Sequence, residues 1–348
     1  MKQIWQRITK WELWPFWLIY IPLAPLWLYY IIKSKQVWFF STVNPTLTFA
    51  GFEGEDKREM YEQLPKHLYP KTIYVSPKSD FEKLKASVAS EGLQYPFIAK
   101  PDIGMHAMMF RKIENEDELL RYHNFATFEY LVQSLVDMPL EFSVFHIRYP
   151  GESKGVVTGF IQKDYLAVTG DGVSTLHELI MAHPKAKYRE AEMQKRHGRN
   201  LDKVIPKGEK FLLSIAGNHN RGARFIDLSY EIDERLTAVF DEISMHAEHF
   251  YYGRYDLKCT SVEDLKAGKN ISILEFNGTG AEPNHIYDCG MSYGKALSTI
   301  AMHWKHMYNI SKINHKKGVP YWSYKRGKQH LKKAKEFFKK LRQYDLEF

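Results

Sequence analysis

An arginine, two carboxylates and an amide stand at alternate positions in two short apolar segments of the sequence. Arg254 and Asp256 are two residues apart in the first segment. Glu275 and Asn277 are two residues apart in the second segment. Residues i and i+2 of a β-strand point to the same face of a sheet, so pairing of the two strands would place all four side chains on one wall. Mg²⁺ prefers oxygen ligands and also binds phosphate oxygens, so the pattern predicts nucleotide chemistry.

A lysine earlier in the chain suits the same chemistry. Lys100 ends an apolar strand predicted over 97–100, just before a proline and a glycine-containing turn at 102–107. An ammonium group at this position can bind phosphates as a point charge. The alternative is a lysine that is simply solvated at the end of a strand.

The segment 129–141 predicts two strands joined by a polar connection at 137–139. Backbone groups of Gln133, Ser134 and Val136 can face an adenine edge. Glu141, at the start of the next strand, can accept hydrogen bonds from ribose hydroxyls. A plain β-turn is the alternative for the same residues.

In chain order, Lys100, Glu141, the Arg254–Asp256 pair and the Glu275–Asn277 pair resemble the ATP-grasp superfamily. The likeness is greatest to D-alanine–D-alanine ligase and to cyanophycin-synthetase-type ligases, and it covers residues 66–310. It implies ATP as the nucleotide, bound at its phosphates by Lys100 and at its adenosine by Gln133, Ser134, Val136 and Glu141. It also implies that Arg254 stabilises an oxyanion, and that two Mg²⁺ ions, with Mn²⁺ as a substitute, are held by Asp256, Glu275 and Asn277.

Five further basic residues acquire a role only through this resemblance. An earlier nucleotide-binding lysine of the family corresponds best to Lys66, with Lys71 as its rival. Lys163 falls where the family has a basic residue near the γ-phosphate. Arg221 and Arg224 either bind phosphate or a substrate carboxylate, or belong to a basic surface loop.

Two features depart from the pattern of the family. The phosphate lysine of the family is usually followed by a loop rich in glycine and serine, whereas residues 102–107 read Asp-Ile-Gly-Met-His-Ala. The adenine segment begins with Gln133, where glutamate is more usual. How the γ-phosphate is covered therefore stays open.

The resemblance implies an α+β fold in which two α+β subdomains grip ATP, preceded by a short α/β cap and an apolar hairpin or helix. The small lobe is expected to end near residue 137 and the large lobe to begin at 138. The expected segments are a membrane-associating segment at 1–35, a reduced cap at 36–96, the ATP-grasp domain at 97–310 and a basic helical tail at 311–348.

The local pattern predicts most elements of this fold. The stretch 183–210 is polar and basic and is expected to be a mobile excursion. Helices are predicted at 55–64, 80–90, 116–125, 174–181, 228–250 and 292–308. Strands are predicted at 37–43, 71–76, 97–100, 108–113, 129–135, 141–149 and 155–163.

The N-terminal region contains twenty consecutive uncharged residues, 13–32, with basic residues on both sides. This length matches a transmembrane helix, and its tryptophans suit a headgroup boundary. Pro22 and Pro25 would bend or break a helix, leaving halves too short to cross a bilayer of about 30 Å. The sequence therefore predicts a re-entrant or interfacial hairpin with both ends cytoplasmic. A kinked single span and a buried core helix are the alternatives.

The composition sets the remaining bounds. The chain has 348 residues, of which 44% are apolar, which suggests two or three packed subdomains. Cys259 and Cys289 form no CxxC pair, which suits a reducing cytosolic compartment. The formal charge is +8, and the run 325–342 holds nine Lys or Arg residues against one Glu. This run is either a solvated helix face or a contact for an anionic surface. The histidines show no zinc-binding spacing.

Together these features predict an ATP- and Mg²⁺-dependent carboxylate–amine ligase at the cytoplasmic face of the cell membrane. Its expected partners are a small-molecule or lipid-linked carboxylate, an amine, and anionic lipid. A non-catalytic membrane adaptor with an ATP-grasp fold is the alternative. A nucleic-acid binder is disfavoured, because the aromatic residues lie in the apolar N-terminus rather than among the basic residues.

Overall fold

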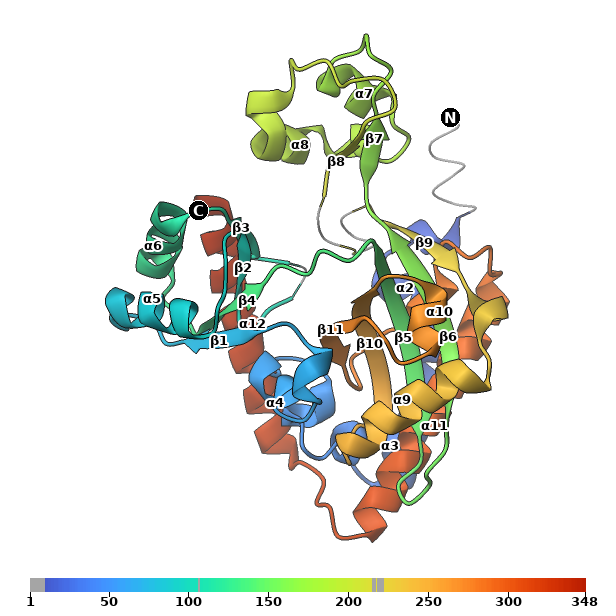
Figure 1. Cartoon of the computed structure of the whole chain (residues 1–348). Coiled ribbons are helices and arrows are strands. Elements are labelled where there is room, and N and C mark those ends of the chain that lie inside the picture. The colour runs from blue at the N-terminus through green and yellow to red at the C-terminus, as the bar shows by residue number, and fades with distance from the viewer. Residues whose placement is uncertain (1–9, 106, 215–216, 218–221) are drawn as a thin grey trace. The chain divides into compact units, whose positions relative to one another are not determined.

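The computed structural model describes residues 10–105, 107–214, 217 and 222–348 (Figure 1). Helices and strands are mixed along the chain, which confirms the predicted α+β class. The chain forms two compact units, Met1–Ile161 with Asp227–Phe348, and Gln162–Ile226. It enters the second unit along β6 (Gly155–Asp164) and leaves it along β9 (Arg224–Asp227). The boundaries predicted at 35, 96 and 310 lie within the first unit.

The first unit contains a four-stranded antiparallel sheet in the order β1-β4-β2-β3. Its apolar face is buried by two helices, so that Leu84 and Leu119 pack with Phe97 and Val132. β1 is hydrogen bonded to β4, so the residues predicted as a separate cap share a sheet with those that follow residue 97. The elements are β1 (Thr72–Val75), α5 (Phe81–Ser90), β2 (Phe97–Pro101), β3 (Arg111–Ile113), α6 (Glu116–Phe125) and β4 (Tyr130–Ser134).

The buried strand predicted over 37–43 is wrong, because Phe39–Thr42 forms the 3-10 helix η3. Thr42 of this segment bonds through its backbone and its side chain to a helix, α11 (Tyr293–Lys316), instead of to a sheet. Asn314 Nδ2 donates to Thr42 O at 2.8 Å, and Thr42 Oγ1 donates to Ser311 O at 3.0 Å. A short buried apolar run has no periodicity that separates a strand from a helical turn.

A five-stranded sheet in the order β11-β10-β5-β6-β9 carries the charged segments. β10 is antiparallel to both β5 and β11, as predicted for the pairing of the two charged segments. The β10–β11 register shifts between Asp256 and Leu257, which marks a β-bulge or irregularity beside the charged residues. The three central elements are β5 (Leu140–Arg148), β10 (Tyr252–Cys259) and β11 (Ile271–Asn277).

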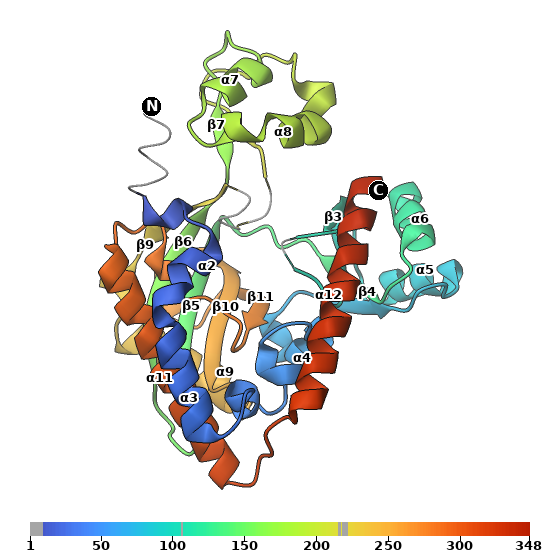
Figure 2. The same cartoon turned by 180° about the vertical axis from the view of Figure 1, so that it is seen from behind.

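Different helices cover the two faces of this sheet. Tyr255 of β10 is buried with Phe240 of α9 (Glu234–His246). Tyr252 of the same strand is buried with Met307 of α11. Figure 1 is seen from the α9 side and Figure 2 from the α11 side. Because side chains alternate along a strand, Asp256 lies on the α11 face, like Tyr252.

The N-terminal apolar segment forms one helical run, so of the predicted hairpin or helix the helix is confirmed and the hairpin is wrong. α2 (Phe16–Tyr20), η2 (Ile21–Leu23) and α3 (Ala24–Ser34) follow one another without a reversal. Pro22 and Pro25 each stand in the first turn of a helical segment, where a missing N–H forfeits no helical hydrogen bond. This run is long and apolar enough to cross a membrane, judged by length and composition alone.

Several predicted elements have different bounds, including the helix predicted over 55–64, which is shortened to Lys57–Tyr61. The helix predicted over 228–250 is the shorter α9, because Asp233 accepts a hydrogen bond from Leu236 N at 2.8 Å and caps it there. The helix predicted over 292–308 continues to Lys316, and the basic tail forms α12 (Tyr324–Glu347). Of the strand predicted over 108–113, three residues form β3. The shorter elements of the first unit are η1 (Trp11–Leu13), η4 (Thr48–Gly51), α4 (Lys57–Tyr61), η5 (Lys66–Leu68), η9 (Ser229–Glu231), α10 (Val262–Lys266) and η10 (Asn284–Ile286).

The basic tail is packed as well as charged. Ala334, Phe338 and Leu341 of α12 are buried in the core of the four-stranded sheet. Arg111 Nη1 of β3 lies 2.9 Å from Asp345 Oδ1 near the end of the helix. One face of α12 therefore packs against the four-stranded sheet, and the lysines of α12 lie on its other faces.

The second unit has its own core, built around Leu176, Ile180 and Met193. The stretch 183–210, predicted as a mobile excursion, contains α8 and the buried Met193 and is therefore folded. Thr175 and Glu178 form a reciprocal capping box at the predicted helix 174–181. The elements are β7 (Ala167–Thr169), α7 (Leu176–Ala182), η6 (Ala186–Arg189), α8 (Glu190–His197), η7 (Gly198–Asn200) and β8 (Lys210–Leu212).

Candidate active site

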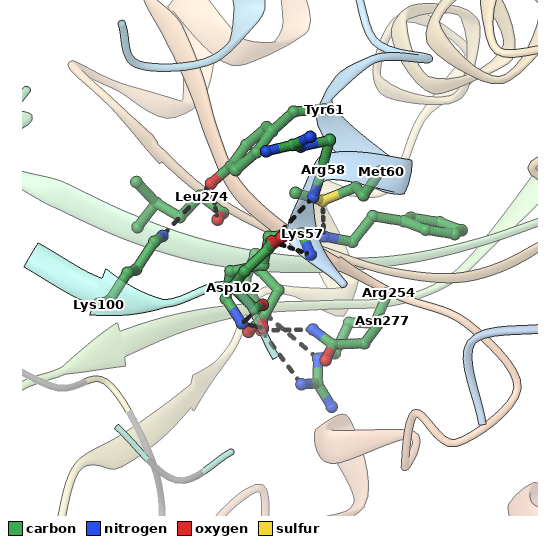
Figure 3. Close-up of polar contacts among 12 residues, drawn as sticks. Lys57, Arg58, Met60, Tyr61, Lys100, Asp102, Arg254, Leu274 and Asn277 are labelled. Carbon is green, nitrogen blue, oxygen red and sulfur yellow. Dashed lines mark hydrogen bonds and ion pairs between the residues drawn. The ribbon is translucent and has the colours of Figure 1, made fainter. Parts of the chain in front are cut away.

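The predicted wall forms on β10 and β11. Asp256 is opposite Glu275 and Arg254 is opposite Asn277 in the antiparallel register. The β10 strand also places Asp256 opposite Ser143 of β5. The four polar side chains therefore lie together, as the sequence pattern predicted. Arg254 and Asn277 are labelled in Figure 3.

Asp256 is the most heavily bonded member of the wall. Arg254 Nη2 lies 3.1 Å from Asp256 Oδ2, and Arg254 Nε donates to Oδ1 at 3.2 Å. Asn277 Nδ2 also donates to Asp256 Oδ2 at 3.2 Å. Ser143 Oγ donates to Oδ1 and accepts from Asn284 Nδ2 at 2.9 Å. These donors satisfy a carboxylate that is only 8% exposed.

Burial alone would lower the pKa of Arg254, but the neighbouring carboxylate of Asp256 raises it above its ordinary value. The guanidinium group therefore remains charged beside Asp256. Its third nitrogen, Nη1, donates to the backbone oxygen of Glu282 at 3.1 Å. This contact fixes the plane of the guanidinium group on the wall.

Glu275 has a different environment. Its side chain is 39% exposed, and Lys57 Nζ lies 3.6 Å from Glu275 Oε1. Lys57 belongs to α4, a five-residue helix that the sequence predicted without assigning it a role in the site. The carboxylate that faces solvent is thus met by a cation from another element.

Asp102, directly after β2, fixes the start of α4. Its Oδ1 accepts from Lys57 N at 2.8 Å and from Arg58 N at 3.1 Å. Lys57 Nζ also donates to the backbone oxygen of Asp102 at 3.3 Å. Burial raises the pKa of Asp102, opposed in part by the backbone N–H groups of α4. The loop after the predicted phosphate lysine therefore begins by binding a helix.

Lys100 lies on β2 and is buried, with 9% of its surface exposed. Its Nζ donates to Tyr61 Oη at 3.3 Å, and Tyr61 Oη donates to Leu274 O of β11 at 2.5 Å (Figure 3). Burial lowers the pKa of Lys100 to about 8, while Glu275 and Asp102 act in the opposite direction. Tyr61 thus orients the lysine and ties β2 to the strand that carries Glu275.

The residues predicted to bind adenine and ribose lie on β4, on β5 and on the connection between these strands. Gln133 Nε2 donates to Thr72 Oγ1 at 2.8 Å, and Ser134 N donates to Lys71 O at 3.0 Å. Both groups are therefore engaged within the four-stranded sheet. Glu141 is buried on β5 opposite Lys258. The ammonium group of Lys258 donates to the backbone oxygen of Val136 at 3.1 Å, which joins the two halves of the segment.

The other basic residues named from the resemblance lie apart from the wall or outside this unit. Lys66 is exposed in η5, and among the described residues no hydrogen bond or ion pair joins it to the wall. Lys71 Nζ instead donates to Glu91 O at 2.8 Å. Lys163, which is buried on β6, and Arg224, which is exposed on β9, belong to the second unit. Arg221 lies outside the described residues.

The glycine-rich stretch after Asn277 is packed against the chain near residue 50. Thr279 N donates to Ala50 O at 3.1 Å, and Gly280 N donates to Gly51 O at 2.9 Å. A Cβ on Gly280 would collide with the backbone oxygen of Phe52, so this close approach requires glycine. The stretch sets the position of Glu282, whose backbone oxygen holds Arg254.

The donor set suits a hard cation. Asp256, Glu275 and Asn277 offer two carboxylates and an amide, which are the oxygen ligands that Mg²⁺ takes. Glu275 is the accessible member, whereas Asp256 would have to exchange some of its present donors. Among the described residues there is no cluster of three or more His, Cys, Asp or Glu side chains suited to a metal.

No protein-family model and no curated protein matches the chain. Solved structures do match it, and they are ligases of the ATP-grasp kind. D-alanine–D-alanine ligase from Bacillus anthracis is 15% identical, with 74% of this chain and 68% of that chain covered and a TM-score of 0.41. N5-carboxyaminoimidazole ribonucleotide synthetase in its ADP complex is 15% identical, with 75% and 53% covered and a TM-score of 0.44.

A bifunctional glutathione synthetase from Pasteurella multocida is 18% identical, with 72% of this chain covered and a TM-score of 0.40. The match spans 36% of the length of that synthetase. The chain is thus similar to ATP-grasp ligases in general. At these TM-scores and identities, the likeness transfers no residue role and no substrate to this chain.

Proposed function

We propose that the chain is an ATP- and Mg²⁺-dependent ligase that joins a carboxylate to an amine. One observation carries the proposal: Tyr61 links Lys100 to the strand of Glu275, while Asp256 and Arg254 complete the same wall. A lysine, an arginine and two carboxylates on facing strands suit a phosphoryl-transfer site, where positioning and charge stabilisation supply most of the catalysis. A scaffold has no need to bury such charges.

The proposed nucleotide lies across the two sheets of the first unit. Gln133, Ser134 and Val136 face the adenine edge, and Glu141 accepts from the ribose. Lys100 binds phosphate oxygens. Asp256, Glu275 and Asn277 hold Mg²⁺, which when bound neutralises the charge on the phosphates. Lys163 and Arg224, which belong to the second unit, stay candidate basic groups on the resemblance alone.

The proposed reaction has two steps. A substrate carboxylate oxygen attacks the γ-phosphorus of ATP, the bond to the bridging oxygen breaks, and ADP leaves an acyl phosphate behind. An amine then attacks the acyl carbon, loses a proton, and expels phosphate as the amide forms. Arg254 donates hydrogen bonds to the oxyanion of the tetrahedral intermediate, where preorganised donors have their largest effect. The substrates are small-molecule or lipid-linked, and an envelope precursor is the favoured class.

We propose that this chemistry takes place at the cytoplasmic membrane face, with the α2–α3 run lying along the lipid surface. Trp17, Ile21, Leu28 and Ile32 recur at helical spacing, and the side chains of Trp17 and Ile32 are 64% and 67% exposed. Lys33, also exposed, ends this stripe near anionic headgroups.

The opposite side of the run is bound to protein. Trp27 and Trp304 have ring centroids 4.7 Å apart, and Tyr20 Oη donates to Glu282 Oε1 at 2.7 Å. A helix that holds these contacts presents one face to lipid, which favours an interfacial position over a span. Burial raises the pKa of Tyr20 far above its ordinary value, so its hydroxyl remains a donor to Glu282.

Release of ADP across a panel of carboxylates and amines tests the ligase proposal. We expect Mg²⁺-dependent ADP release with at least one pair, coupled to amide formation and lost in Glu275→Gln. Turnover that survives this substitution would contradict the proposed metal ligands. Absence of nucleotide binding and of ADP release would favour the adaptor instead.

Sedimentation with vesicles tests the membrane proposal separately. We expect the full chain to bind vesicles that contain phosphatidylserine, and the variant Trp17→Ser/Ile21→Ser/Ile32→Ser to remain in the supernatant. Leu120→Ser, at an exposed leucine of α6, is the apolar control. Equal binding by the triple variant would contradict the lipid-facing stripe.

A further inference from the structure

We propose that Lys57 of α4 binds the terminal phosphoryl group of ATP. This inference rests on the proposed function. It adds to the site a cation that binds the third phosphate of ATP. It explains why a short helix, remote from the wall in sequence, is fastened so closely to it.

Lys57 is held at the edge of the wall. Its Nζ lies 3.6 Å from Glu275 Oε1 and donates to Asp102 O at 3.3 Å. Only 13% of its side chain is exposed, whereas that of Glu275 is 39% exposed. The ammonium group therefore sits beside the most accessible carboxylate of the site. Among the described contacts it has one long ion pair and one neutral acceptor, and the carboxylates of Glu55 and Asp102 also interact with its charge. Such a cation is free to gain a stronger anionic partner.

The anchoring of α4 makes this position a defined one. Met60 Sδ accepts from Phe276 N of β11 at 2.7 Å, in the residue after Glu275. Tyr61, four residues after Lys57, binds Leu274 O on the same strand and meets Lys100. Residues i and i+4 lie on one face of a helix, so α4 directs Lys57 and Tyr61 to the wall together.

The order of residues along β2 indicates which phosphate of ATP Lys57 would bind. Ile98 pairs with Gln133, at the adenine end of the proposed site. At about 3.3 Å per residue, Lys100 lies about 7 Å and Asp102 about 13 Å farther along the chain. Lys57 is bonded to Asp102, so it is the outermost of these cations. A nucleotide with its adenine at Gln133 reaches Lys100 first and Lys57 last.

The loop that follows β2 supports the same assignment. Lys57 Nζ lies against Gly104, where a Cβ atom would be 3.9 Å from the nitrogen. The residues of this loop lack the glycine- and serine-rich pattern, and the carboxylate of Asp102 is used on α4. A cation from α4 therefore stands next to this loop, where the outer phosphate would be bound.

The test compares two nucleotides on the full chain. Titration calorimetry measures binding of Mg²⁺-ADP and of the Mg²⁺ complex of β,γ-imido-ATP. Lys57→Met should weaken the triphosphate analogue about tenfold or more and leave ADP within about twofold, because one charge-assisted contact is lost at the third phosphate. Lys57→Arg, which keeps the charge, should recover most of the difference. Lys83→Met, at an exposed lysine of α5, is the matched control and should change neither.

Each other outcome has a defined meaning. Equal weakening of both nucleotides would show that Lys57 acts through the wall, and unchanged binding of both would show that it makes no phosphate contact; either overturns the inference alone. Thermal unfolding of each variant checks that α4 remains folded, and Lys57→Gln, which also removes the charge, repeats the nucleotide comparison if Lys57→Met unfolds. If the wild-type chain binds neither nucleotide, the proposed function falls and the inference falls with it.

Discussion

The two carboxylates of the wall face each other across β10 and β11 but have different surroundings. Asp256 is buried and accepts hydrogen bonds from Arg254, Asn277 and Ser143. Glu275 is partly exposed, and its one described ion pair is the long contact with Lys57. The first carboxylate therefore belongs to the structure as much as to the site, whereas the second is available to a ligand. Substitutions should separate the two roles.

Removal of the Asp256 carboxylate should have the largest effect. Asp256→Ala leaves the buried guanidinium of Arg254 without its partner, and loss of one member of a buried pair costs about 3–5 kcal/mol. Unfolding in urea measures this loss. Asp256→Asn, which keeps the shape and one acceptor, should be clearly less destabilising. Equal and small effects of both would mean that the buried pair contributes little to stability.

Glu275→Gln should separate function from folding. The free energy of unfolding should change by less than about 1 kcal/mol, because the carboxylate is exposed and its ion pair is long. Mg²⁺-dependent ADP release should fall by about a hundredfold or more, because a metal ligand is lost. Glu263→Gln, at an exposed ion pair with Arg235, is the matched control and should change neither quantity.

Tyr61→Phe should have an intermediate effect. It removes the hydroxyl that joins Lys100 to Leu274 O, and a buried hydrogen bond of this kind contributes about 1–2 kcal/mol. Affinity for ATP should fall with it, because Lys100 loses the group that orients it. A variant with normal stability and normal ATP affinity would show that the hydroxyl does not position the lysine.

The smallest effect should be one of pH. Burial lowers the pKa of Lys100 from 10.5 to about 8 in the folded chain. Between these values the unfolded chain binds more protons, so stability should rise with pH relative to Lys100→Met. ATP affinity should fall over the same interval, because the ammonium group loses its proton. The measurement is the free energy of unfolding of the wild type minus that of Lys100→Met. A difference that does not change from pH 8 to 10 would contradict the lowered pKa.

The sequence predicted the wall because alternation and strand pairing are local rules. Arg254, Asp256, Glu275 and Asn277 needed two short strands and one antiparallel contact to meet. Lys100 followed from the end of an apolar strand. The predictions at Lys66, Lys163 and Arg224 rested on resemblance alone, and they remain proposals.

The role of Lys57 could not be predicted from the sequence, because it depends on tertiary contacts and not on a local pattern. A lysine in the first turn of a short helix has the pattern of a solvated residue, and its place depends on the docking of α4 through Asp102, Met60 and Tyr61. The buried run 37–43 failed as a strand because its partner is α11, a helix more than 250 residues later in the chain. Contacts of this kind are set by tertiary packing, which a single sequence does not display.

The central claim is that the wall and Lys100 bind Mg²⁺-ATP. Titration calorimetry of ATP into the wild-type chain and into Glu275→Gln, with Mg²⁺ and with EDTA, tests it most directly. The proposed function predicts Mg²⁺-dependent binding to the wild-type chain and loss of that dependence in Glu275→Gln, with unfolding unchanged. Binding of ATP that is the same with Mg²⁺ and EDTA, or the same in both proteins, would contradict it.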